Sequence, residues 1–193
     1  MADKNADKNA DKKKALLVVD LQRGVLADDG TWDPDGVVSR VAGLVDQARV
    51  ADVPVVWVQH NSDELVAGTP VWELADGLRP EAGETVVQKW YGDSFEETPL
   101  TDVLTEVGAE HLVVAGAQTD ACIRSTIHGA LVRGYDVTLV SDCHTTGEIP
   151  AEYSGGEAIS ALTKINFTNL YASWGMRYPG RSGSAETSAE IVF

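Results

Sequence analysis

The chain has 193 residues, of which 44% are hydrophobic, and this size and composition indicate a single globular domain. Its 30 acidic residues outnumber 15 basic ones, and the net charge of −15 argues against binding to nucleic-acid phosphates. Two cysteines are too few for a disulfide scaffold, no apolar run is long enough to span a membrane, and the polar N-terminus lacks a secretory pattern. We therefore expect a cytoplasmic protein with no nucleic-acid or membrane partner.

Residues 1–14 are of low complexity, because the unit Ala-Asp-Lys-Asn begins at Ala2 and again at Ala6. This segment has no apolar face to bury, so we expect an N-terminal tail before one domain over residues 15–193. The domain begins with the apolar run 15–19, which is typical of a strand buried on both faces.

Strand-like and helix-like segments alternate through the rest of the domain. The predicted strands cover residues 15–19, 54–58, 85–89, 111–115, 136–140 and 169–172. The predicted helices begin at Asp33-Pro34, Thr98-Pro99, Asp120 and Ala158. This alternation predicts an α/β fold with three layers, α/β/α, around a mostly parallel six-stranded sheet. The irregular stretch 59–83 is long for a loop inside a compact domain, and such loops are usually functional.

Polar residues follow several predicted strands at their carboxyl ends. Asp20 follows the first strand, Lys89 ends the third, and the turn at Gly116 follows the fourth. Active sites of open parallel sheets lie at this edge, so we expect these residues to lie near one another.

Cys122 lies where a tight turn leads into a predicted helix. A thiol in the first turn of a helix faces the positive end of the helix dipole, which favours the thiolate and predicts a lowered cysteine pKa. Free backbone N–H groups of the same turn would point at a developing oxyanion. The alternative is a small buried cysteine that packs the helix onto the sheet, which is common for free cysteines.

Asp20 and Lys89 each have a functional and an ordinary interpretation. The carboxylate of Asp20 could act as general base for the thiol, or it could cap the turn after the strand. The ammonium of Lys89 could hold a thiolate and an oxyanion by charge, or it could extend into solvent at the sheet edge.

Taken together, four motifs resemble those of the isochorismatase-like superfamily of cysteine hydrolases, which includes nicotinamidases and N-carbamoylsarcosine amidohydrolase. Their order and spacing match over about residues 15–175. The motifs are Leu16 to Gln22, Lys89 with Ser94-Phe95 and Thr98 to Leu100, Val114 to Ile123, and Gly134 to Val137 with Val140 to Cys143.

The resemblance implies a catalytic triad of Asp20, Lys89 and Cys122. It also implies a cis peptide between Ala117 and Gln118, and an oxyanion hole formed by the N–H groups of Gln118 and Cys122. The implied activity is hydrolysis of an amide-type C–N bond of a small molecule through a cysteine thioester, without a cofactor. Relatives are commonly oligomeric, so a homodimer or homotetramer is expected.

The sequence departs from the nicotinamidase pattern, in which an Asp-x-His pair and a second His bind a metal. Here only His60 is present in that stretch, with no Asp two positions before it and no second His before Lys89. We therefore expect no metal site. His60 either contacts substrate or caps its strand.

Several other residues are candidates for contact with substrate. Trp90 and Tyr91 follow Lys89 and could form the wall of a pocket for a flat or apolar substrate, or pack under the long loop. The remaining candidates are Ala117 and Thr119 in the turn and His144 after the fifth strand, which could also cap its loop. We expect Cys143 to pack, with no catalytic role.

Two other functions are compatible with the resemblance. The first is hydrolysis of a vinyl ether in an isochorismate-like compound, although family members with that activity generally lack the cysteine. The second is a non-catalytic role through oligomer contacts, in which case the thiol of Cys122 would be unreactive.

Overall fold

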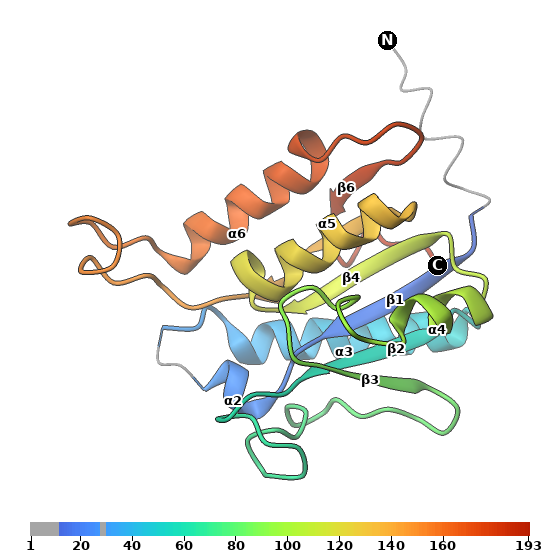
Figure 1. Ribbon diagram of the computed structural model, residues 1–193, viewed down its shortest axis with the longest axis horizontal. Coiled ribbons are helices and arrows are strands. Elements are labelled where there is room, and N and C mark those ends of the chain that lie inside the picture. Colours follow the sequence, from blue (N-terminus) through green and yellow to red (C-terminus); the bar gives the residue numbers. More distant parts are fainter. Residues whose placement is uncertain (1–11, 28–29) are drawn as a thin grey trace.

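The computed structural model describes residues 12–27 and 30–193, and its strands form one parallel sheet in the order β3-β2-β1-β4-β5-β6 (Figure 1). The strands are β1 (Lys14–Val19), β2 (Val55–His60), β3 (Thr85–Lys89), β4 (His111–Ala117), β5 (Asp136–Thr145) and β6 (Gly183–Glu186). The helices are α2 (Arg23–Leu26), α3 (Pro34–Val50), α4 (Leu100–Glu106), α5 (Arg124–Arg133) and α6 (Ala161–Leu170). Two π-helical turns, η1 (Thr119–Ile123) and η2 (Tyr171–Gly175), complete the fold.

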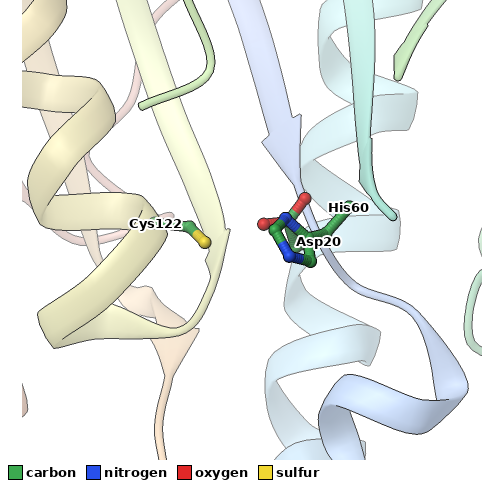
Figure 2. A group of neighbouring side chains, drawn as sticks. All are labelled: Asp20, His60 and Cys122. Atoms are coloured by element: carbon green, nitrogen blue, oxygen red, sulfur yellow. The ribbon is translucent and has the colours of Figure 1, made fainter. Parts of the chain in front are cut away.

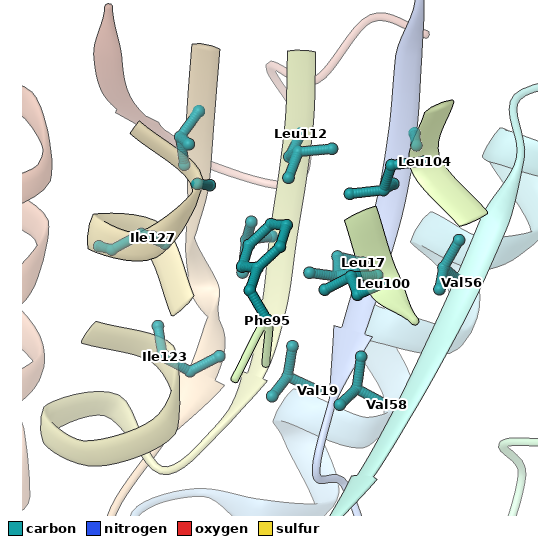
Figure 3. Close-up of a cluster of buried hydrophobic side chains, with 14 of the residues drawn as sticks. Leu17, Val19, Val56, Val58, Phe95, Leu100, Leu104, Leu112, Ile123 and Ile127 are labelled. Carbon is teal, nitrogen blue, oxygen red and sulfur yellow. The ribbon is translucent and has the colours of Figure 1, made fainter. Parts of the chain in front are cut away.

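Alternate residues of the central strand β1 face opposite layers of the molecule. Leu17 and Val19 pack with Leu100, Leu104 and Ile127 of α4 and α5 (Figure 3). On the other face, residues 16 and 18 pack with the apolar stripe of α3, which is Val37, Val41, Leu44, Val45 and Ala48. Because β1 is buried on both faces, its sequence is a continuous apolar run. The predicted three-layer α/β/α fold is confirmed.

The predicted last strand, residues 169–172, is wrong. These residues lie at the end of α6 and the start of η2, and the edge strand is instead β6, paired with β5 from Val137 to Val140. The sequence of β6, Gly-Ser-Ala-Glu, is short, half-buried and without an apolar pattern. Its strand conformation follows from the free hydrogen-bonding edge of β5, so sequence periodicity could not find it.

The predicted tail lies outside the described residues except for its last three, and Lys14 already belongs to β1. Within the described ranges, every helix is too short or too polar to cross a membrane.

Gly116 brings the end of β4 against the end of β1. Its φ is 137°, and a Cβ built at this position would lie 1.9 Å from the carbonyl oxygen of Val19. The register between β4 and β5 shifts between Val114 and Gly116, so the chain bends here before it enters η1. Only glycine combines this φ with so close an approach of two backbones.

We expect Gly116→Ala to lower the free energy of unfolding by about 2–4 kcal/mol, because the added methyl group overlaps Val19 and the φ is unfavourable. The matched control is Gly43→Ala in α3, where an added Cβ meets nothing within 4 Å. That change should stabilise the protein by about 0.5–1 kcal/mol, because alanine is the better helix former. Urea unfolding measures both, and equal effects of the two substitutions would contradict the prediction.

Candidate active site

The site lies at the carboxyl edge of the sheet, where the chain leaves four neighbouring strands. Asp20 follows β1, His60 and Lys89 are the last residues of β2 and β3, and Cys122 lies in η1 after β4. β3 is two strands away from β1, and the four-carbon side chain of Lys89 reaches across β2 to Asp20. Figure 2 shows the sulfur of Cys122 pointing from its helical turn towards Asp20 and His60.

The Lys89 ammonium is the centre of this group of side chains. Its Nζ lies 2.7 Å from Oδ2 of Asp20, 3.1 Å from Sγ of Cys122, 3.3 Å from Nδ1 of His60 and 3.0 Å from the carbonyl oxygen of Tyr91. The Lys89 side chain is fully buried and that of Asp20 is 1% exposed. The sequence predicted that Asp20, Lys89 and Cys122 lie near one another, and the structure brings them into contact.

Burial and mutual charge set the protonation of this group. Burial raises the pKa of Asp20, and the charge and hydrogen bond of Lys89 partly offset this rise. Burial by itself would lower the Lys89 pKa, but attraction to Asp20 and Cys122 leaves that pKa raised. The resting site therefore contains an ammonium beside a buried carboxyl group that holds a proton more readily than an exposed aspartate does.

The predicted lowering of the cysteine pKa is wrong for this resting arrangement. Burial and the nearby negative charge of Asp20 raise the pKa of Cys122 to about 12, and Lys89 offsets only part of this rise. The π-helical turn that carries Cys122 runs directly into α5, so a helix start is present, but burial is the largest influence on the pKa of this thiol. The thiol therefore becomes anionic only when its proton moves to a neighbouring base.

The donor set of the site does not fit a metal ion. Among the described residues, Asp20, His60 and Cys122 offer ligand atoms that lie within 4.8 Å of one another. The ammonium of Lys89, however, lies within 3.3 Å of an atom of each of them. A divalent cation between these ligands would lie against that ammonium, so charge repulsion opposes its binding.

His60 faces the site as a neutral imidazole. Burial and the positive charge of Lys89 lower its pKa, so its Nδ1 can accept a hydrogen bond from the ammonium. The backbone of His60 is held by Gln22, whose side chain accepts from the His60 N–H at 2.8 Å and donates to its carbonyl oxygen at 3.0 Å. Contact with Lys89 is thus a third interpretation of His60, and substrate contact and strand capping both stay open.

Gln22 and Asn61 are residues of the site that sequence reasoning missed. Both are buried, and both tie the long loop to strand ends: Gln22 donates to the carbonyl oxygen of Trp72, and Asn61 accepts from the Trp72 indole at 3.0 Å. Asn61 also donates to the carbonyl oxygen of Lys89. In the sequence, each of them is only a polar residue beside a strand end. Ordinary loop residues occur at the same kind of position, so this pattern does not single them out.

Trp90 and Tyr91 do not pack under the long loop. Their side chains are exposed, Trp90 by 65% and Tyr91 by 47%. They lie directly beyond Lys89, and an exposed aromatic pair at this position favours contact with a bound molecule over core packing.

The remaining candidates for substrate contact, Ala117, Thr119 and His144, are fully buried. Both ring nitrogens of His144 bond to protein groups, Nδ1 to Thr119 and Nε2 to Asn169, each at 2.8 Å. Contact of these three residues with substrate stays a prediction. The peptide between Ala117 and Gln118 is cis.

Comparison with known proteins places this geometry in a family. The model of the isochorismatase domain matches residues 14–162, which includes all four strand ends of the site. The chain belongs to the isochorismatase family. A streptothricin hydrolase from Streptomyces noursei is 38% identical to this chain over 167 residues. The matched region covers 84% of this chain and 65% of the length of that hydrolase.

Two further relatives agree in sequence or fold. A maleamate amidohydrolase from Pseudomonas putida is 29% identical over 153 residues, which cover 68% of this chain and 72% of that enzyme. The crystal structure of a cysteine hydrolase from Pseudomonas syringae pv. phaseolicola superposes with a TM-score of 0.83 at 23% identity. That superposition covers 92% of this chain and 90% of the other, and it shows a shared fold.

We expect stability to fall between pH 7 and pH 5 through two buried histidines. Burial lowers the pKa values of His111 and His144 from 6.5 to about 4. The unfolded chain therefore takes up protons that the folded chain excludes, and stability is full above about pH 6.5 and declines below it. Each histidine should cost roughly 2 kcal/mol of unfolding free energy by pH 5.

Urea unfolding at pH 7, 6 and 5 of the parent protein, His111→Gln and His144→Gln measures this decline as a difference in slope, which cancels the opposite contribution of the raised Asp20 pKa. His128→Gln is the control for loss of a histidine at an exposed position. Equal slopes in the parent protein and in the His111→Gln and His144→Gln variants would contradict the prediction.

Proposed function

We propose that the chain is a cysteine hydrolase that cleaves an amide-type C–N bond of a small molecule through a thioester on Cys122. The observation that carries this proposal is the buried ammonium of Lys89, which lies 2.7 Å from the carboxylate of Asp20 and 3.1 Å from the sulfur of Cys122. A base, a cation and a thiol in mutual contact are the groups that nucleophilic acyl transfer requires.

In the first step, Asp20 accepts the thiol proton as Sγ of Cys122 attacks the carbonyl carbon. Burial has raised the pKa of Asp20, which makes its carboxylate a stronger base than an exposed aspartate. The C–S bond forms while the carbonyl π electrons move to oxygen. Lys89 stays charged, and its contact with both Asp20 and Cys122 compensates negative charge on either atom as the proton moves.

We assign the oxyanion to the backbone N–H groups of Gln118 and Cys122, at the start of η1. Each such donor contributes roughly 3–4 kcal/mol to stabilisation of the transition state in enzymes of this kind. The nucleophile and its oxyanion hole then come from one turn, which follows the bend at Gly116.

The tetrahedral intermediate collapses when the C–N bond breaks and protonated Asp20 gives its proton to the leaving nitrogen. The acyl group remains on Cys122 as a thioester. Asp20, again a carboxylate, then removes a proton from water that attacks the thioester carbon. The acid is released and the Cys122 thiol regains its proton from Asp20.

The relatives support C–N cleavage. The matched streptothricin hydrolase and maleamate amidohydrolase are hydrolases by name, and the second name specifies an amide-type bond. Vinyl-ether hydrolysis has less support, because it would leave the contact between Cys122 and Lys89 without a role. A non-catalytic role would likewise leave unexplained why an ammonium is buried against a thiol.

Cys122→Ala should lower kcat at least about 1000-fold, and Asp20→Asn by a similar factor, because each removes a group that acts in the chemical step. Cys143→Ala is the control, since Cys143 lies in the core on the α3 side of the sheet and should retain activity within about twofold. A screen of small amides, ureas and lactams for release of ammonia or amine supplies the substrate.

Acid quench of the turning-over enzyme, followed by intact-mass and peptide mass spectrometry, should then show an acyl adduct on Cys122. Full activity in Cys122→Ala, without an adduct in the parent protein, would disprove the proposal.

The charge around the site favours neutral or cationic substrates. Segments 90–99, 118–123 and 146–160, which follow β3, β4 and β5, contain seven acidic residues and no lysine or arginine. Asp93 and Asp120 pair with Arg133 and Lys164. The others are exposed, namely Glu96, Glu97, Glu148, Glu152 and Glu157. Their combined negative potential attracts cations and repels anions at the carboxyl edge of the sheet.

We expect an amide that bears an ammonium group to have a higher kcat/KM than an amide of equal size that bears a carboxylate. The difference should shrink as sodium chloride rises from about 20 to about 500 mM, because salt screens exposed charges. Steady-state kinetics with such a pair of amides measures this effect. A preference for the carboxylate, or a ratio that does not respond to salt, would contradict it.

A further inference from the structure

A chain of three hydrogen bonds lies behind the turn that carries Cys122. Oγ1 of Thr119 in η1 lies 2.8 Å from Nδ1 of His144 in β5, and Nε2 of His144 lies 2.8 Å from Oδ1 of Asn169 in α6. Nδ2 of Asn169 donates to the carbonyl oxygen of Ser141, 3.0 Å away in β5. Thr119 and His144 are fully buried and Asn169 is half-buried, so water is excluded from the bond between Thr119 and His144.

The last acceptor fixes the direction of every bond in the chain. A backbone carbonyl only accepts, so the amide nitrogen of Asn169 faces Ser141 and its oxygen faces His144. Nε2 of His144 must then carry the proton, and Nδ1 is left as an acceptor for the hydroxyl of Thr119. Because burial lowers the pKa of His144 to about 4, the imidazole is neutral and can donate and accept at the same time.

These hydrogen bonds join three elements of the fold beside Cys122. Thr119 begins η1, three residues before Cys122, and His144 and Asn169 anchor it to β5 and α6. The hydrogen bond between Cys122 and Lys89 thus depends on the position of η1, whose first side chain, Thr119, is bonded to His144.

We propose that Thr119, His144 and Asn169 are positioning residues that hold η1 so that the sulfur of Cys122 meets the ammonium of Lys89. The proposal rests on the proposed cysteine-hydrolase function of the same site. None of the three residues need contact substrate, since each acts through the position of the turn. A displacement of the nucleophile by about 1 Å is enough to slow catalysis about 100-fold.

The protein contains a matched control at the other end of β5. His111 and Thr138 are a second buried histidine–threonine pair, with Nε2 of His111 2.8 Å from Oγ1 of Thr138. Thr138 faces Ser184 of the edge strand and is remote from η1 in the sheet register. Thr119→Val and Thr138→Val therefore remove the same hydroxyl from similar surroundings, but only the first lies behind the nucleophile.

We expect Thr119→Val to lower kcat about 100-fold with KM unchanged within about twofold, and Thr119→Ser to restore most of the loss. Thr138→Val should leave kcat within about twofold. The rate of iodoacetamide alkylation of Cys122, followed by peptide mass spectrometry, should fall about tenfold in Thr119→Val and stay unchanged in Thr138→Val.

A double-mutant cycle tests whether Thr119 and Asn169 are energetically coupled through His144. Thr119 and Asn169 bond to opposite nitrogens of His144, so coupling between them passes through that ring. The double variant Thr119→Val/Asn169→Leu should alkylate no more slowly than the slower single variant, whereas the effects of Thr138→Val and Asn169→Leu should multiply.

Nitrogen NMR of His144 in the unsubstituted protein provides a measurement that needs no variant, and it should show the Nε2–H tautomer at pH 7. An Nδ1–H tautomer, equal effects of the two threonine substitutions, or independent effects of Thr119→Val and Asn169→Leu would overturn the proposal. Alkylation requires no turnover, so these results remain interpretable if no amide is hydrolysed and the proposed function fails instead.

Discussion

The site depends on one buried charge, the ammonium of Lys89. Transfer of an isolated ammonium from water into a protein interior is costly, and the cost is offset only where partners of opposite charge or hydrogen-bond acceptors surround it. Here the partners are Asp20, Cys122, His60 and the carbonyl oxygen of Tyr91, all within 3.3 Å of Nζ. Four strand ends must therefore keep their relative positions for the ammonium to remain satisfied.

This requirement links the sheet to the chemistry. The order β3-β2-β1-β4 brings the lysine, the histidine, the aspartate and the turn that carries Cys122 to one edge. Gly116 permits β4 to approach β1 closely, and Gln22 fixes the end of β2 through the backbone of His60. The same ammonium occupies the space among Asp20, His60 and Cys122 in which a metal ion would bind. In this chain a lysine therefore supplies the positive charge of the site.

Family membership and the order of the elements could be read from the sequence, because buried parallel strands have continuous apolar runs and their ends have polar residues. Asp20, Lys89 and Cys122 were identifiable for that reason, although their roles as a triad, the homodimer or homotetramer and the cytoplasmic location stay predictions. β6 could not be found, because its strand conformation comes from pairing with β5. His144 was placed at the right edge of the sheet, but its hydrogen bonds to Thr119 and Asn169 were not found, since sequence does not tell which side of a turn a polar residue occupies.

By itself, the sequence determined the fold class, the strand ends that form the site and the three residues at its centre. Local apolar periodicity and short motifs encode these features, and both depend on neighbours in the chain. The tertiary structure alone decided the protonation of the site, the direction of the hydrogen bonds behind Cys122 and the exposure of Trp90 and Tyr91. These features depend on burial and on charges brought from distant segments, and desolvation raises the pKa of Cys122, which the local sequence predicts to be lowered.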